Sequence, residues 1–181
     1  MAAPIRTAPG VLFLCTGNSA RSILAECLLA RIGESRFRSY SAGSHPKPAP
    51  HPAALALLRR HGYATDTLRS KSWDEFTGPD APQIDLVFTV CDNAAGESCP
   101  VWPGHPLTAH WGIPDPADVV EPGDEQRRAF EQAYAALEQR IRRFTRLPLE
   151  NLSAARLEAE LRDIGVGEPH TNQESGPSGT A

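Results

Sequence analysis

The eight residues from Cys15 to Ser22 (Cys-Thr-Gly-Asn-Ser-Ala-Arg-Ser) constrain the fold of this 181-residue chain more than any other stretch. They follow a short apolar run, residues 11–14, which is typical of a strand buried on both faces of a parallel sheet. They lead into residues 22–30, whose helix-forming and mostly apolar composition predicts a largely buried helix. The stretch is therefore predicted to be the end of a strand, a tight turn and the start of a helix.

A turn of this kind is suited to binding an oxyanion. The first N–H groups of a helix have no partner within it and lie at the positive end of its dipole. Gly17 and Asn18 tolerate the left-handed backbone angles that let successive amides curl around an anion, and Arg21 adds a planar charged fork. Cys15, with Ser22 able to donate to its sulfur, is expected to have a lowered pKa and to act as a nucleophile. The alternative is an inert buried cysteine.

The rest of the chain predicts alternating strands and helices. Further strands are expected at residues 38–41 and 84–90, and further helices at residues 52–60, 124–147 and 153–164. Such alternation predicts an α/β fold with a three-layer, doubly wound, mainly parallel sheet. In a flavodoxin-like strand order the first and third strands are neighbours.

Helix boundaries are predicted from local signals. Pro52 suits a first helical position, Ser153 suits an N-cap, and Pro148 and Gly165 are expected to end the last two helices.

Two cysteines are brought together by the predicted strand order. Cys15 ends the first strand and Cys91 follows the third, and these strands are neighbours in that order. A second thiol is therefore expected near the nucleophile.

Four segments carry a resemblance to a known family. The stretch Cys15–Ser22 resembles the active-site loop of the low-molecular-weight phosphotyrosine phosphatase superfamily. With residues 89–93 (Thr-Val-Cys-Asp-Asn), 98–100 (Ser-Cys-Pro) and 110–117 (His-Trp-Gly-Ile-Pro-Asp-Pro-Ala), the chain is more narrowly similar to the arsenate reductase branch. The resemblance spans about residues 10–147. It implies a four-stranded sheet in the flavodoxin-like order 2-1-3-4 and reduction of arsenate to arsenite.

The resemblance also implies roles for individual residues. Cys15 would attack arsenic, Cys91 would attack Cys15 and release arsenite, and Cys99 would resolve that disulfide and carry it outward. Asp115, in the Asp-Pro pair, would protonate the departing hydroxyl, although a turn or N-cap role is the alternative. The oxyanion would be bound by the loop residues Thr16, Gly17, Asn18, Ser19, Ala20, Arg21 and Ser22.

Two positions depart from the family pattern. Seven residues separate Cys91 from Cys99, one more than is usual in thioredoxin-coupled members, and Ala20 replaces a cysteine common in the loop. A glutathione or mycothiol adduct on Cys15, reduced by a glutaredoxin-type protein, is therefore an alternative to the internal relay.

A zinc site is a further alternative for the later cysteines. It would combine Cys91 and Cys99 with His105 and His110, but this cysteine spacing is wider than in structural zinc sites, so no metal is expected. Cys27 lies among apolar helix positions and is expected to be inert core.

The proposed chemistry requires thiols rather than a bound cofactor. The expected partners are arsenate, with phosphate or sulfate as mimics, and a reductant such as thioredoxin, glutaredoxin or a low-molecular-weight thiol. The family also suggests a monovalent cation near Asn18, Glu26 and Ser41, with an ordinary helix carboxylate as the alternative role of Glu26.

Composition excludes several other classes of protein. No apolar run reaches membrane-spanning length, the first ten residues lack the apolar segment of a secretory signal, and the net charge is −4 with no basic tract. We therefore expect a cytoplasmic monomer that binds neither membrane nor nucleic acid, with four cysteines reduced at rest.

The chain divides into four predicted parts. These are an N-terminal extension (1–9), the phosphatase-like domain (10–147), an additional helix packed on it (148–165) and a disordered tail (166–181).

Two rival functions use the same loop. A phosphatase would hydrolyse a phosphocysteine with water, but the acid segment lacks the tyrosines expected beside a phosphotyrosine pocket, and Cys91 and Cys99 would have no role. A non-catalytic oxyanion-binding or metal-sensing module is the other rival. Substitution of Cys15 by Ser would separate binding from catalysis.

Overall fold

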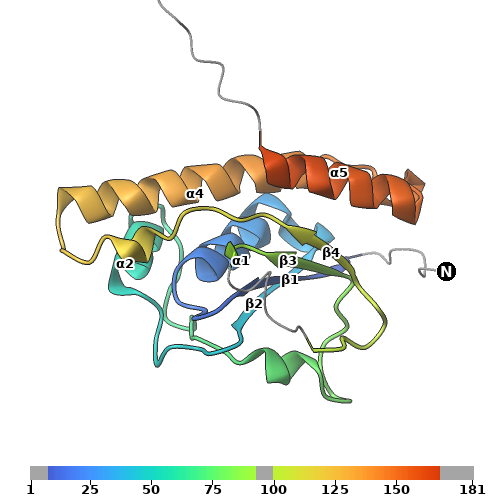
Figure 1. Cartoon of the computed structure of the whole chain (residues 1–181), viewed down its shortest axis with the longest axis horizontal. Coiled ribbons are helices and arrows are strands. Elements are labelled where there is room, and N and C mark those ends of the chain that lie inside the picture. Colours follow the sequence, from blue (N-terminus) through green and yellow to red (C-terminus); the bar gives the residue numbers. More distant parts are fainter. Residues whose placement is uncertain (1–7, 93–99, 168–181) are drawn as a thin grey trace, which may run out of the picture.

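A four-stranded parallel sheet lies at the centre of the molecule. The computed structural model describes residues 8–92 and 100–167. The strands are β1 (Gly10–Cys15), β2 (Arg38–Gly43), β3 (Leu86–Thr89) and β4 (Leu107–His110), and they lie in the order β2-β1-β3-β4 (Figure 1). The predicted α/β class, parallel pairing and strand order are confirmed.

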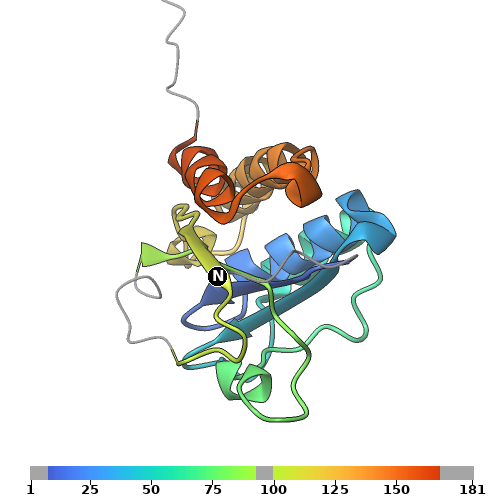
Figure 2. The same cartoon turned by 90° about the vertical axis from the view of Figure 1, so that its right-hand side faces the viewer.

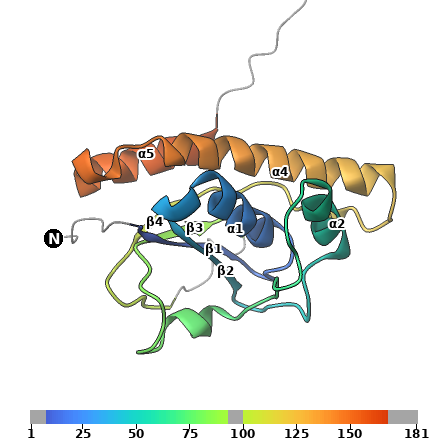
Figure 3. The same ribbon diagram turned by 180° about the vertical axis from the view of Figure 1, so that it is seen from behind.

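Four α-helices of the described residues lie on one side of this sheet. They are α1 (Arg21–Ile32), α2 (Pro52–Arg60), α4 (Asp124–Thr145) and α5 (Ala154–Val166). Figures 2 and 3 show α1 next to the sheet and α4 and α5 stacked above it, with α2 beside one end of α4. This helical face contains the larger of two apolar clusters.

Short 3₁₀ segments and loops complete the described fold. The four 3₁₀ segments are η1 (Glu34–Arg36), η2 (Trp73–Phe76), η3 (Pro116–Asp118) and η4 (Leu149–Asn151). The second face of the sheet is covered by η2 and its flanking loops (Figure 2). A right-handed crossover from the edge strand β2 past β1 to β3 must pass over this face, which explains its position.

The strands alternate between the two clusters with a period of two residues. In β1, Val11 and Phe13 face the helices, whereas Leu12 and Leu14 face η2, and all are buried. Burial on both faces explains why β1 reads as a continuous apolar run rather than an alternating one.

Aromatic rings fill the helical face near the sheet's later strands. Trp111, just after β4, is fully buried and stacks on Phe88 with 4.0 Å between ring centroids, and Phe144 of α4 packs edge-on against both rings. Such rings supply much of the buried apolar area of a small domain.

The last two helices differ from the prediction at their ends. Helix α4 ends at Thr145, before Pro148, and the Ser153 side chain caps α5 as predicted by accepting from Arg156 N at 3.2 Å. The prediction that Gly165 ends α5 is wrong. The helix continues to Val166, and Gly167, with φ of 75°, is the C-cap.

Close packing explains the glycine at position 165. A Cβ there would lie 2.2 Å from the His110 carbonyl oxygen and 2.9 Å from Trp111 Cδ1. Gly165 therefore lets the helix backbone contact the end of β4 directly. Residues 1–7 of the predicted N-terminal extension (1–9) and residues 168–181 of the predicted tail (166–181) lie outside the described residues.

None of the helices in residues 8–92 and 100–167 has the length and hydropathy needed to cross a membrane.

We predict that Gly165→Ala destabilises the fold by about 1–3 kcal/mol, because the added methyl group overpacks against the His110 carbonyl. In an unconstrained helix the same change would stabilise by about 0.5–1 kcal/mol. Urea unfolding measures the difference. Gly78→Ala is the control, because a Cβ there meets nothing within 4 Å. Equal stability of Gly165→Ala and the wild type would contradict the close contact.

Candidate active site

The loop between β1 and α1 folds around the sulfur of Cys15. The Asn18 amide donates to Cys15 Sγ at 3.1 Å, and Ser22 Oγ lies 2.8 Å from the same sulfur. Asn18 has a φ of 42°, the left-handed conformation expected from the sequence, and its side-chain amide donates to Ser22 Oγ at 2.9 Å. The loop thus directs hydrogen-bond donors at the sulfur.

Four successive carbonyl groups of the loop bond to the surrounding protein. Three accept from backbone N–H groups of the proline-rich connection 44–52, which we call the strap, and one accepts from a serine hydroxyl. The pairs are His45 N to Thr16 O (2.9 Å), Lys47 N to Gly17 O (2.9 Å), His51 N to Ser19 O (2.8 Å) and Ser70 Oγ to Asn18 O (2.7 Å). The N–H and C=O of a planar trans peptide point in opposite directions, so these bonds leave the amides facing the loop's interior.

Gly43 permits this conformation of the loop because it has no side chain. A Cβ at Gly43, the last residue of β2, would lie 2.4 Å from the Thr16 carbonyl oxygen and 2.9 Å from Asn18 N. Any side chain at that position would displace the loop.

The pKa of Cys15 differs from the prediction. Burial raises the pKa of this thiol above its usual value, and the hydrogen bonds from Ser22 and Asn18 only partly oppose it. The predicted help from Arg21 is absent because its guanidinium is directed elsewhere, to the Ile113 carbonyl (3.0 Å) and Asp115 (2.7 Å). The expectation of a lowered Cys15 pKa is therefore wrong, since a sulfur 5% exposed loses more solvation than two or three hydrogen bonds restore.

Cys91 lies beside the loop, as the strand order requires. Its sulfur is 3.8 Å from Thr16 Oγ1, the residue is 2% exposed, and its charge is among the factors that raise the pKa of Cys15. Cys99 lies outside the described residues. The structure therefore places two of the three predicted relay cysteines together.

His110 makes polar contacts at the sheet edge. Its ring lies 2.8 Å from Thr89 Oγ1 and 2.9 Å from Asp92 Oδ1, the carboxylate that follows Cys91. Within residues 8–92 and 100–167 no group of three or more His, Cys, Asp or Glu side chains could hold a metal ion, and the zinc alternative also involves Cys99. His110 is thus hydrogen-bonded to two residues, Thr89 and Asp92, that flank Cys91 in the sequence.

Asp115 caps a 3₁₀ segment, the alternative role predicted for it, and also pairs with Arg21. Its Oδ1 accepts from Ala117 N at 3.1 Å and caps η3, while its Oδ2 pairs with Arg21 Nη2 at 2.7 Å. The two side chains are 31% and 13% exposed, and both border a cavity of about 410 Å³ that also contains Cys91. The carboxyl group is therefore placed at the mouth of the oxyanion loop.

Lys71 occupies the place considered for a monovalent cation. Its ammonium lies 3.4 Å from Glu26 Oε2 and 3.3 Å from Ser41 Oγ, and its backbone N–H donates to Asn18 Oδ1 at 2.7 Å. Glu26 also accepts a hydrogen bond from Ser41. The residues fit a buried ammonium rather than an added cation.

Cys27 behaves as predicted. It is 7% exposed, and burial, followed by the charge of Glu26, raises the pKa of its thiol to about 12. It is consequently a poor nucleophile.

The strap and Lys71 were not assigned site roles from the sequence. The sequence of the strap does contain a recognisable pattern, because prolines at positions 46, 48, 50 and 52 remove every second backbone N–H donor. No local pattern identifies the partner of Lys71.

The fold and loop define a family. Residues 10–161 match the low molecular weight phosphotyrosine protein phosphatase family, and the chain belongs to it. Among its relatives, an arsenate reductase of Bacillus licheniformis is 33% identical over 135 residues, which cover 74% of this chain and 93% of the relative.

Solved structures of an arsenate reductase and of a tyrosine phosphatase resemble the chain. The arsenate reductase of Archaeoglobus fulgidus is 28% identical, with a TM-score of 0.59 over 75% of this chain and 98% of that one. The tyrosine phosphatase Wzb of Escherichia coli K30, solved with phosphate, is 26% identical, with a TM-score of 0.56 over 77% and 91%.

We predict that Ser22→Ala raises the pKa of Cys15 further, because the variant removes the side-chain hydrogen bond that lowers it most. The rate of iodoacetamide alkylation at pH 7–8 should fall, and its pH profile should move to higher pH. Peptide mapping assigns the modified thiol, and a Cys27→Ala background removes the one buried cysteine with no proposed role. An unchanged profile would show that Ser22 does not tune the sulfur.

Proposed function

We propose that this protein is a thiol-coupled arsenate reductase. The observation that carries the proposal is the buried Cys91 thiol 3.8 Å from Thr16 Oγ1, beside the predicted nucleophile Cys15. Hydrolysis of a phosphocysteine needs only water, whereas reduction of arsenic needs a thiol that can attack Cys15. The similarity to curated arsenate reductases at 30–33% identity supports the same reading.

In the first step the Cys15 thiolate attacks arsenate bound by the loop amides. A sulfur–arsenic bond forms, an arsenic–oxygen bond breaks, and Asp115 gives its proton to the departing oxygen so that water leaves. Arg21, whose Nη2 lies 2.7 Å from Asp115 Oδ2 in the structure, carries a planar charged guanidinium suited to binding the anion. Its proposed role is to stabilise the oxyanion together with the amides.

In the second step the Cys91 thiolate attacks the sulfur of Cys15. The electron pair of the sulfur–arsenic bond passes to arsenic, which leaves as arsenite, and a Cys15–Cys91 disulfide forms. Cys99 then attacks Cys91, freeing the Cys15 thiolate and leaving a Cys91–Cys99 disulfide for an external dithiol to reduce. Two electrons thus pass from two protein thiols to arsenic.

A phosphatase activity is the second candidate, because the similarity extends to the tyrosine phosphatase Wzb. The cavity beside Arg21 argues against an aryl phosphate as the main substrate. Its lining residues are Arg21, Cys91, Asp92, Gly112, Ile113, Pro114, Asp115 and Asp118, with no aromatic side chain among them. A small inorganic anion needs no aromatic wall, so arsenate fits better.

The reductant is proposed to be thioredoxin, glutaredoxin or a low-molecular-weight thiol, and phosphate and sulfate are proposed as unreactive mimics. Cys15 and Cys27 are free thiols in the structure, which suits a reducing compartment such as the cytoplasm. We propose that the protein acts there as a monomer. Light scattering during size exclusion tests the last point.

The relay predicts a defined product when the reduced protein meets one equivalent of arsenate without added thiol. One equivalent of arsenite should appear together with a Cys91–Cys99 disulfide, detected by intact mass and peptide mapping. Cys15→Ser should abolish arsenite release while retaining phosphate binding, and Cys27→Ser, the matched control, should leave both unchanged.

Other outcomes of this experiment identify the rival functions. Arsenite formed only after addition of glutathione and glutaredoxin would replace the internal relay with an adduct on Cys15. Hydrolysis of aryl phosphate without arsenite under any thiol condition would make the protein a phosphatase. Anion binding without either reaction would make it a binding module.

We predict that turnover does not require a monovalent cation, because the Lys71 ammonium already pairs with Glu26. Replacing KCl by tetramethylammonium chloride at equal ionic strength should leave kcat unchanged. Lys71→Met should lower stability by about 1–3 kcal/mol, since the Glu26 carboxylate, only 19% exposed, loses its charged partner. Thermal unfolding measures this change. A wild-type enzyme activated by K⁺ would show that the site binds a cation in addition to the lysine.

A further inference from the structure

The segment from Trp111 to Asp115 is bonded by two arginines. Arg21 of α1 donates to the Ile113 carbonyl at 3.0 Å and pairs with Asp115 at 2.7 Å. Arg140 of α4 donates to the carbonyls of Trp111 at 2.9 Å and Gly112 at 3.2 Å. Arg21 therefore holds this segment from the start of α1, and Arg140 holds it from α4.

Arg140 is an unusual residue for a purely structural position. It is half-buried, and burial lowers the pKa of its guanidinium. Its guanidinium donates to three neutral carbonyl groups, and no ion pair links it to a carboxylate in the described part of the chain. A partly desolvated cation without a counter-charge is costly, so geometry rather than net stability is the reason to place it there.

The third partner of Arg140 belongs to α5. Arg140 Nη2 donates to the Gly165 carbonyl at 3.2 Å, and the buried Trp111 Nε1 donates to the Leu161 carbonyl at 2.9 Å. Gly165 also approaches the His110 carbonyl so closely that a Cβ would not fit. The end of α5 is thus bonded to the segment that carries Asp115.

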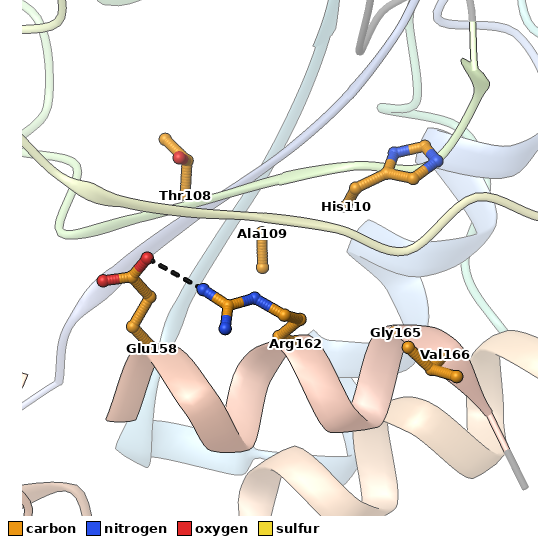
Figure 4. A pocket seen from close by; sticks show the side chains of 7 residues that line it. All are labelled: Thr108, Ala109, His110, Glu158, Arg162, Gly165 and Val166. Atoms are coloured by element: carbon orange, nitrogen blue, oxygen red, sulfur yellow. Dashed lines mark hydrogen bonds and ion pairs between the residues drawn. The ribbon is translucent and has the colours of Figure 1, made fainter. Parts of the chain in front are cut away.

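The remainder of the contact between α5 and β4 is more open. A cavity of about 420 Å³ lies between them, lined by the Glu158–Arg162 ion pair, by Thr108 and Ala109, and at one end by His110, Gly165 and Val166 (Figure 4). At that end Arg140 donates to the Gly165 carbonyl. Gly165 lies beyond residue 161, where the match to the family ends.

We propose that Arg140 is a positioning residue that acts through Asp115. By fixing the Trp111 and Gly112 carbonyls against the end of α5, it sets where the chain delivers Asp115 beside Arg21 and the loop. This inference rests on the proposed role of Asp115 as the acid. Misplacement of a reacting group by about 1 Å can cost about a hundredfold in rate, so a remote contact of this kind has a measurable effect.

A double-mutant cycle tests the proposal. Arg140→Met removes the fork but keeps most of the apolar stem, and Arg142→Met, an exposed position on the same helix, is the matched control. Arg140→Met should lower kcat for arsenate reduction about tenfold to a hundredfold. It should leave the affinity for phosphate unchanged, and Arg142→Met should change neither quantity. In an Asp115→Asn background the same Arg140→Met change should have almost no further effect, because both act on one step.

Two results would overturn the proposal. One is an Arg140→Met variant whose kcat equals that of Arg142→Met. The other is an equal loss of kcat on Arg140→Met substitution in the wild-type and Asp115→Asn backgrounds. If Arg140→Met does not fold, Arg140→Lys enters the same cycle, since it keeps the charge but loses the fork.

A measurement independent of turnover separates this proposal from the proposed function. Hydrogen exchange of residues 111–115 should be faster in Arg140→Met than in the wild type and in Arg142→Met. If the wild type does not reduce arsenate, the proposed function fails, and the cycle is repeated with hydrolysis of an aryl phosphate. Unchanged exchange in residues 111–115 would overturn the positioning role whatever reaction the protein catalyses.

Discussion

Hydrogen bonds from the surrounding protein to the carbonyls of residues 16–19 determine what the oxyanion loop can do. A short loop in water would turn its peptide groups in many directions. Here three N–H groups of the strap and the Ser70 hydroxyl hold four successive carbonyls. The opposed amides are then fixed toward the interior, so the donors need no reorganisation when negative charge develops there. Gly43 is part of the same arrangement because it lets β2 lie against the loop.

Much of the fold and part of the site could be predicted from the sequence. Apolar runs and alternating elements are local patterns, and they predicted the α/β class. The strand order that places Cys91 beside Cys15 came from the resemblance to a known family. The Gly165 error has a physical cause, because a glycine near a helix end reads as a stop unless the carbonyl packed against it is known. The raised pKa of Cys15 was missed for a similar reason. The sequence shows the possible hydrogen-bond donors, but only the fold shows the depth of burial.

Lys71 and Arg140 show what local patterns omit. Each is one of 18 basic residues, and nothing nearby in the sequence distinguishes it from the solvated ones. Lys71 acquires its importance from Glu26, 45 residues away, and Arg140 from carbonyls 25–29 residues away. Their partners are set by tertiary packing of helices on the sheet. The role of Cys99 stays a prediction, since it lies outside the described residues.

The wide separation of the loop's partners along the chain affects how the site forms during synthesis. The strap lies about 30 residues after Cys15, but the Arg21 partners Ile113 and Asp115 lie 92 and 94 residues from that arginine. Contacts of such high sequence separation form late in folding because the intervening chain must first be ordered. A nascent chain that ends before Asp115 therefore contains the Cys15 loop without the carboxylate that pairs with Arg21. That pair can form only after β4 and the segment that follows it have been synthesised.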